Sequence, residues 1–98
     1  MTTELFGIEE LFSLIQERKV HPSPGSYTNQ LFAKGEDAIL QKVGEEAVEV
    51  LIAAKGQGNA RLVEEISDLF YHTLVLLAAK GLTLTDIETE LARRHNPR

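Results

Sequence analysis

The sequence predicts an all-α domain of four or five helices. Apolar residues recur at the spacing of three and four positions that places them on one face of a helix. No segment alternates apolar and polar residues over a length sufficient for a strand. Glycines and prolines separate the periodic segments. The chain has 98 residues, which is the length of one domain with a modest core. We therefore expect a single domain over residues 1–98.

The first helix is expected over residues 8–18. Four apolar side chains follow one helical face in this segment: Ile8, Leu11, Phe12 and Ile15. The segment 20–25 contains two prolines, each of which removes a backbone donor and restricts the residue before it. A loop is therefore expected there.

A short helix and a long central helix follow this loop. Ser26 or Thr28 can cap the short helix, which extends to Lys34. Gly35 can end it in a left-handed conformation. The central helix is then expected over residues 36–55.

Two further helices are expected in the second half of the chain. The segment 56–59 contains two glycines that end the central helix, and Asn59 can cap the next one. That helix is expected over residues 60–80. Thr85 and Glu88 have the spacing of a capping box, which predicts a last helix to about Arg94.

Composition excludes several classes of function. Fifteen acidic against ten basic residues give a net charge of −5, so we expect no nucleic-acid partner. The absence of cysteine excludes disulfides, thiolate metal ligands and cysteine nucleophiles. Residues 1–6 lack the pattern of a secretory signal, and the longest apolar run, residues 74–79, is too short to span a bilayer. We expect no membrane association and a cytoplasmic location.

The central helix is apolar on two sides. One broad face is predicted to form core and contains Ile39, Val43, Ala47, Val50, Leu51 and Ala54. Val48 and Ile52 lie on nearly the opposite side. A small domain has little material to cover both faces, so the pattern predicts a homodimer built around this helix.

Acidic side chains form a stripe on each of the two longest predicted helices. The central helix carries Lys42, Glu45, Glu46 and Glu49 on one stripe, and the next helix carries Arg61, Glu65, Asp68 and His72. If these stripes meet across a groove, Glu46, Glu49, Glu65 and Asp68 converge. Clustered carboxylates repel one another unless a cation neutralises them.

Oxygen ligands without cysteine select hard ions, Mg²⁺ first and Mn²⁺ second. The chemistry that such a site supports is metal-assisted attack of water on a phosphoryl group. The acid spacing alone leaves a second interpretation open, in which Lys42 pairs with Glu46 and Arg61 with Glu65 on solvated helix faces. A lone histidine such as His72 is more often a hydrogen-bonded structural residue than a ligand.

Several motifs resemble one enzyme family. KVGEEAVE at 42–49 and EISDLFYH at 65–72, together with Ser-Tyr-Thr at 26–28 and Lys-Gly-Glu-Asp at 34–37, are similar to the phosphoribosyl-ATP pyrophosphohydrolases. The four acids alone are shared with the wider MazG-like all-α nucleoside triphosphate pyrophosphohydrolases. The resemblance implies a MazG-like helical bundle completed by homodimerisation.

The resemblance also implies an activity and its residues. The reaction would be Mg²⁺-dependent hydrolysis of phosphoribosyl-ATP to phosphoribosyl-AMP and pyrophosphate, the second step of histidine biosynthesis, by a cytoplasmic homodimer or dimer-based assembly. The implied metal ligands are Glu46, Glu49, Glu65 and Asp68. The implied catalytic acids are Glu45, Glu46 and Glu49, and the implied substrate contacts are Tyr27, Thr28, Lys34 and Lys42, with His72 beside the site.

Two alternative functions fit the same pattern. One is a house-cleaning pyrophosphohydrolase that acts on ordinary or damaged nucleoside triphosphates. The other is a metal-free helical dimerisation module, in which the acids form solvated helix faces.

Overall fold

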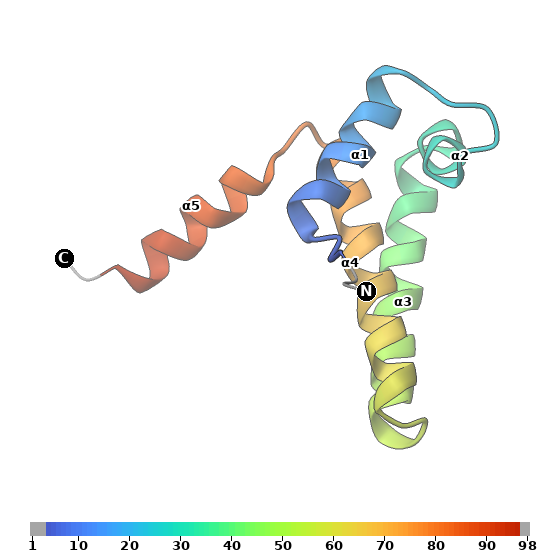
Figure 1. Cartoon of the computed structure of the whole chain (residues 1–98), viewed down its shortest axis with the longest axis vertical. Coiled ribbons are helices and arrows are strands. Elements are labelled where there is room, and N and C mark those ends of the chain that lie inside the picture. The colour runs from blue at the N-terminus through green and yellow to red at the C-terminus, as the bar shows by residue number, and fades with distance from the viewer. Residues whose placement is uncertain (1–3, 97–98) are drawn as a thin grey trace.

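The computed structural model describes residues 4–96, and the regular structure in this range is entirely helical (Figure 1). The helices are α1 (Ile8–Val20), α2 (Tyr27–Lys34), α3 (Glu36–Gly56), α4 (Asn59–Ala79) and α5 (Leu84–His95). This confirms the predicted all-α class with five helices. The sequence interpretation of residues 1–6 falls partly outside the described range, because residues 1–3 are not described.

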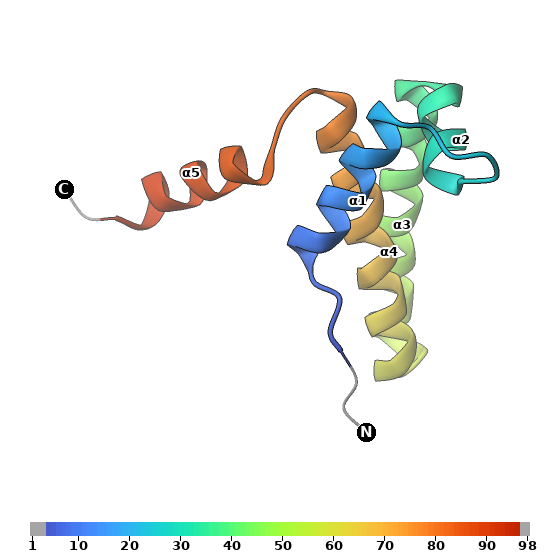
Figure 2. The same ribbon diagram turned by 45° about the horizontal axis from the view of Figure 1, so that its top comes forward.

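The helices α3 and α4 form an antiparallel hairpin that organises the molecule (Figures 1 and 2). The helix α1 packs against α4, and α2 packs against both α1 and α3. Helices α1 and α2 lie toward the end of the hairpin that is remote from its turn, while α5 extends away from the other four helices. No helix in the described range is long and apolar enough to cross a membrane.

Local signals placed most of the helix ends correctly. Ser26 caps α2, since its hydroxyl accepts a hydrogen bond from the Asn29 backbone N–H at 3.2 Å. Gly35 follows α2 with a φ of 101°, a conformation that favours glycine, and α3 begins at the next residue. The predicted starts of α1 and α3 are confirmed.

Two predicted caps are wrong. Gly58, with a φ of 87°, precedes α4, and Asn59 is already the first residue of that helix. At α5 the cap is Thr83, which accepts a hydrogen bond from the backbone N–H of Asp86 and donates its own backbone N–H to the Asp86 carboxylate at 2.8 Å. Thr85 offers the same local spacing, so the choice between the two threonines depends on tertiary packing. Leu84 packs against the core as the first residue of α5.

The hydrophobic core lies where α1 and α2 cover the hairpin. Its buried side chains are Phe12, Ile15, Leu31, Ile39, Leu74, Val75, Leu77 and Ala78. The ends of α1 and α4 are also joined by a polar contact, because Lys19 Nζ donates to the carbonyl oxygen of Ala78 at 2.7 Å. This carbonyl at the end of α4 also accepts from the backbone N–H of Gly81, so Lys19 supplies a second donor.

The predicted core face of α3 is wrong in its second half. Ile39 is buried as expected, but Ala47, Leu51 and Ala54 are exposed, Leu51 by 65%. Glu46 and Ala53 turn inward instead. The helical wheel placed the most apolar side of α3 toward the core, whereas the structure places carboxylates on the side that faces α4. The exposed side therefore retains apolar residues that one chain leaves uncovered.

Candidate active site

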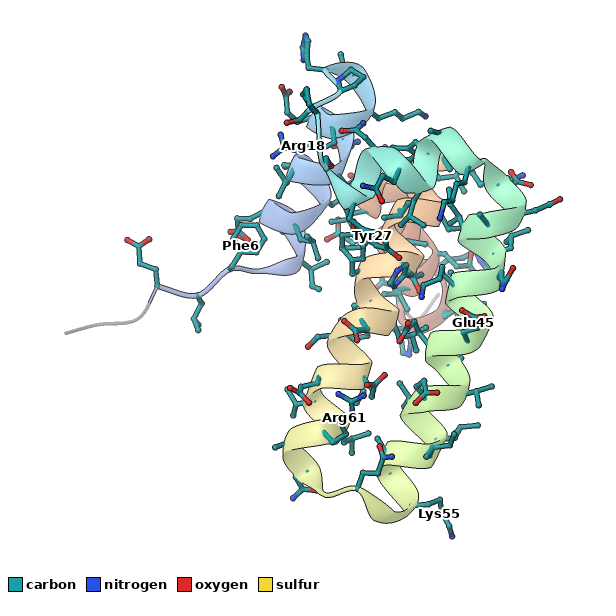
Figure 3. All side chains as sticks on the ribbon, turned by 90° about the vertical axis from the view of Figure 1, so that its right-hand side faces the viewer. Phe6, Arg18, Tyr27, Glu45, Lys55 and Arg61 are labelled. Atoms are coloured by element: carbon teal, nitrogen blue, oxygen red, sulfur yellow. The ribbon has the colours of Figure 1, made fainter. Side chains whose placement is uncertain are left out.

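An acidic groove lies between α3 and α4, toward the turn of the hairpin (Figure 3). The residues that line it come from the two stripes recognised in the sequence: Lys42, Glu45, Glu46 and Glu49 from α3, and Arg61, Glu65 and Asp68 from α4. The antiparallel pairing of two long helices brings residues of distant sequence position to opposite walls. The predicted convergence of the two stripes is thus present in the fold.

Three carboxylates form a cluster within this groove. One oxygen each of Glu46, Glu65 and Asp68 lies within 4.8 Å of the other two. Glu65 is buried, Glu46 is half-buried and Asp68 is exposed. Clustered carboxylate oxygens of this kind fit a hard divalent cation, and the exposed side leaves room for further ligands.

Glu65 has the most unusual environment of the three. It is 2% exposed, and burial raises the pKa of its carboxyl above the ordinary value of 4.5. The neighbouring acids Asp68, Glu46 and Glu49 raise this pKa further, while Arg61 opposes them. A cation beside Glu65 would stabilise its ionised form.

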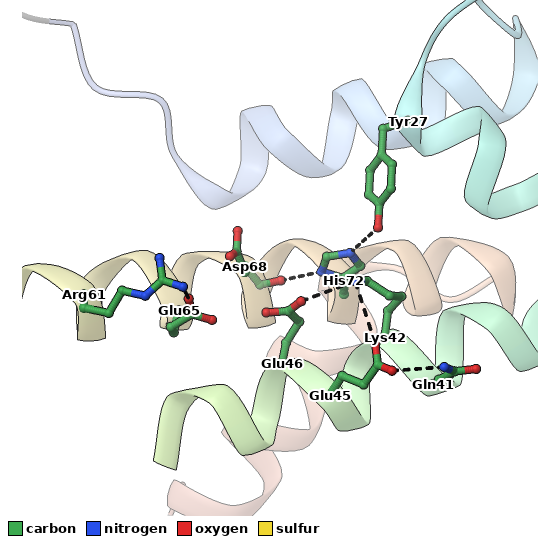
Figure 4. Close-up of polar contacts among 9 residues, drawn as sticks. All are labelled: Tyr27, Gln41, Lys42, Glu45, Glu46, Arg61, Glu65, Asp68 and His72. Carbon is green, nitrogen blue, oxygen red and sulfur yellow. Dashed lines mark hydrogen bonds and ion pairs between the residues drawn. The ribbon is translucent and has the colours of Figure 1, made fainter. Parts of the chain in front are cut away.

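Two basic side chains flank the cluster (Figure 4). Lys42 Nζ lies 3.6 Å from Glu46 Oε1 and 3.8 Å from Glu45 Oε1. Arg61 Nη2 lies 2.7 Å from Glu65 Oε1. Both ion pairs of the second interpretation are therefore present, and they coexist with the carboxylate cluster. Local pairing along each helix does not prevent the acids from facing one another across the groove.

The remaining predicted acids occupy different positions in the groove. Glu49 lines it but does not belong to the cluster of three. Glu45 is exposed at the rim, where its carboxylate accepts a hydrogen bond from Gln41 Nε2 at 3.0 Å. The roles assigned to these two residues by the resemblance stay predictions.

A polar network joins α2 to α4 beside the cluster. The Nδ1 atom of His72 lies 2.8 Å from the carbonyl oxygen of Asp68. A carbonyl oxygen only accepts, so Nδ1 carries the hydrogen and donates. In that tautomer Nε2 accepts from the Tyr27 hydroxyl at 3.0 Å. His72 is buried and hydrogen-bonded, as expected for a structural histidine.

The other two predicted substrate contacts lie elsewhere. Thr28 is buried, and its hydroxyl is hydrogen-bonded to that of Tyr71. This bond gives Thr28 a packing role between α2 and α4. Lys34 lies in the last turn of α2 and does not line the groove. The structure therefore brings Lys42 into the groove but not Thr28 or Lys34.

Sequence reasoning missed one feature of this region. The Thr28 to Tyr71 bond joins residues 43 positions apart, and no local spacing predicts it. Arg61, by contrast, was expected on the same stripe as Glu65, and the structure places it on the α4 wall of the groove.

The antiparallel hairpin carries carboxylates that face one another across a groove, which is consistent with the MazG-like all-α pyrophosphohydrolase class that the sequence resemblance implied. The comparison with known families agrees, since the model described as "Phosphoribosyl-ATP pyrophosphohydrolase" matches residues 8–95. The chain belongs to the phosphoribosyl-ATP pyrophosphohydrolase family.

Individual relatives support this assignment. A phosphoribosyl-ATP pyrophosphatase of Lactiplantibacillus plantarum is 53% identical over 88 residues, which is 90% of this chain and 83% of the relative. One of Clostridium acetobutylicum is 52% identical over 88 residues, with 90% and 80% covered. A histidine biosynthesis bifunctional protein HisIE of Caldanaerobacter subterraneus is 54% identical over 92 residues. The match covers 91% of this chain but only 45% of that longer protein.

Proposed function

We propose that this chain hydrolyses phosphoribosyl-ATP to phosphoribosyl-AMP and pyrophosphate, the second step of histidine biosynthesis. The observation that carries the proposal is the cluster of Glu46, Glu65 and Asp68 in a chain of this family. The relatives with high identity are named for this activity. Their similarity extends over about nine tenths of the chain, which includes both walls of the groove.

Mg²⁺ is the proposed cofactor, with Mn²⁺ as a substitute. Glu46, Glu65 and Asp68 would hold the ion, and Glu49 lies in the same groove as a further ligand or as a base. When bound, the ion would neutralise phosphate oxygens and lower the pKa of a water molecule. The donor set suits this ion because it consists of carboxylate oxygens with solvent access on one side.

The chain's own residues would position the substrate and receive the proton. Lys42 is half-buried on the α3 wall, where its ammonium group can contact a phosphate oxygen. Glu45 and Glu49 are groove acids outside the cluster, so they are the proposed acceptors of the proton from the attacking water. Glu46 would contribute as a ligand, and Tyr27 with His72 would hold the α2 side of the site through their hydrogen bond.

A comparison of substrates tests the proposal. The chain is assayed with phosphoribosyl-ATP and with ordinary nucleoside triphosphates at equal concentrations, with and without Mg²⁺. We expect efficient release of pyrophosphate from phosphoribosyl-ATP but not from the ordinary nucleoside triphosphates. We also expect this release only when Mg²⁺ is present. Good cleavage of ordinary triphosphates with poor cleavage of phosphoribosyl-ATP would favour the house-cleaning alternative. No cleavage of either, and no binding of Mg²⁺, would favour the dimerisation module.

We further propose that the functional form is a homodimer in the cytoplasm. Support for the dimer comes from exposed apolar side chains on the outer side of α3, namely Val48, Leu51 and Ile52. A second copy would remove this apolar surface from water. Fractionation of cells that express the chain at native levels would test the location.

A further inference from the structure

The geometry points to Arg61 as a second phosphate-binding residue, which contacts the pyrophosphate portion of the substrate from the α4 wall, opposite Lys42. This inference deepens the proposed function and rests on it. It adds a recognition residue that lies outside the acidic cluster and outside the motifs of the family resemblance.

Arg61 is placed for this role in the first turns of α4. Its guanidinium lines the groove and is held at two points, by Glu65 at 2.7 Å and by Glu64 at 3.2 Å. The guanidinium has five N–H donors, more than these two contacts use. The side chain is 50% exposed, so the remaining donors are accessible from the solvent.

The charge of the groove explains why such a residue is needed. Five acidic and two basic side chains line it, which gives a formal charge of −3. A polyphosphate would be repelled by this surface, and a single divalent cation leaves the balance negative. Lys42 and Arg61 are the basic residues among those that line the groove, and they stand on opposite walls, Lys42 on α3 and Arg61 on α4 (Figure 4).

Arg61 lies across the groove from α3, because Lys42 and Glu49 of that helix line the same groove. A cation bound to Glu65 would weaken the ion pair between this carboxylate and Arg61. The planar guanidinium could then donate to two oxygens of one phosphate.

Binding of inorganic pyrophosphate tests the inference without turnover. Calorimetric titrations at a fixed free Mg²⁺ concentration compare the wild type with Arg61→Gln, Arg61→Lys and Lys55→Gln. Lys55 lies near the end of α3 and outside the groove lining, so its loss is a matched change of charge. We expect Arg61→Gln to weaken binding by about tenfold or more, Arg61→Lys to weaken it less, and Lys55→Gln to leave it unchanged. Equal affinity in the wild type and Arg61→Gln would overturn the inference.

A second titration separates phosphate binding from the support of Glu65. Mn²⁺ is titrated alone and followed by electron paramagnetic resonance. We expect similar Mn²⁺ affinities in the wild type and Arg61→Gln. A loss of Mn²⁺ affinity as large as the loss of pyrophosphate affinity would assign Arg61 to cation binding and overturn its phosphate role.

Two further measurements check the folding of Arg61→Gln and the hydrolysis of phosphoribosyl-ATP by the wild type. If circular dichroism shows that Arg61→Gln is unfolded, the pyrophosphate affinity of Arg61→Lys tests the inference instead. This variant keeps the positive charge but loses the planar guanidinium. Unchanged pyrophosphate affinity in Arg61→Lys would then overturn the inference. A wild type that hydrolyses phosphoribosyl-ATP while the Arg61 variants bind pyrophosphate normally leaves the proposed function intact. A wild type without hydrolysis contradicts the proposed function itself.

Discussion

The hydroxyl of Tyr27 lies 3.0 Å from Nε2 of His72 and joins α2 to α4 one turn beyond Asp68. The other ring nitrogen of His72 donates to the carbonyl oxygen of Asp68. The imidazole is therefore fixed at both nitrogens, between the first residue of α2 and a groove residue of α4. This relationship couples the packing of a short helix to the wall of the acidic groove.

We predict that Tyr27→Phe destabilises the fold by about 1 kcal/mol, because it leaves a buried imidazole nitrogen without its donor. Urea unfolding followed by circular dichroism measures this change. Ser67→Ala is the control, since it removes a hydroxyl whose bond to the Val63 carbonyl is exposed on the same helix. Its effect is expected to stay within about 0.5 kcal/mol. Equal losses in the two variants would contradict a special role for the Tyr27 bond.

We predict that Glu49→Gln lowers turnover by roughly 100-fold or more while cation affinity falls less than in Asp68→Asn. The reason is that Asp68 belongs to the cluster of three, whereas Glu49 lines the groove outside it. Steady-state kinetics and Mn²⁺ titration measure the two quantities. Glu88→Gln on α5 makes the same chemical change away from the groove and should preserve both. Normal turnover in Glu49→Gln would remove this residue from the catalytic machinery.

We predict that Mg²⁺ stabilises the protein against heat and that Glu65 is required. A cation present at about 100 times its dissociation constant adds about 2.7 kcal/mol to the stability of the folded state. In a domain of this size that gain raises the melting temperature by roughly 13 °C. Glu65→Gln keeps the shape of the side chain but removes the buried charge, so the shift should largely disappear. An equal shift in this variant would place the cation elsewhere.

The pH dependence of α5 follows from Glu90. Its carboxylate accepts hydrogen bonds from Arg93 and Arg94, which lower its pKa from the ordinary value of 4.5 to about 2. A lowered pKa means that the folded state favours the ionised form. The stabilisation is therefore present above pH 4.5 and is lost as the pH falls from 4.5 to about 2. An NMR titration of the Glu90 carboxyl measures this, and Arg93→Gln should move the midpoint upward. A wild-type midpoint near 4.5 would show that the pairs do not persist in solution.

The sequence predicted what depends on local chemistry. Gly35 adopts a positive φ that other residues rarely reach, and the prolines after α1 restrict the backbone, so these residues indicated helix ends without tertiary information. The facing acids were also predictable, because Glu46 and Glu65 lie on polar stripes of two long helices joined by a short turn. The choice between Thr83 and Thr85 was not, since both have an acid three residues later.

Tertiary packing determined the rest. The rotation of α3 about its axis decides whether Leu51 or Glu46 faces α4. A helical wheel of α3 alone predicts that the apolar face with Leu51 lies in the core. The structure turns Glu46 inward and leaves Leu51 in solvent. The bond between Thr28 and Tyr71 likewise arises from the docking of α2 on α4. These features depend on which helix faces which, and no single helix contains that information.

The exposed side of α3 supplies a direct test of the proposed homodimer. Leu51 is 65% exposed in the single chain, so Leu51→Glu should leave the helix content and the fold of that chain intact. In a dimer built on α3 the same change would bury an unpaired charge, which costs several kcal/mol and prevents association. Light scattering at micromolar concentration should give twice the chain mass of 10.9 kDa for the wild type and the mass of one chain for Leu51→Glu. Leu14→Glu on α1 is the matched control and should remain dimeric. A wild-type mass of one chain would contradict the dimer, and a dimeric Leu51→Glu would place its interface on another face.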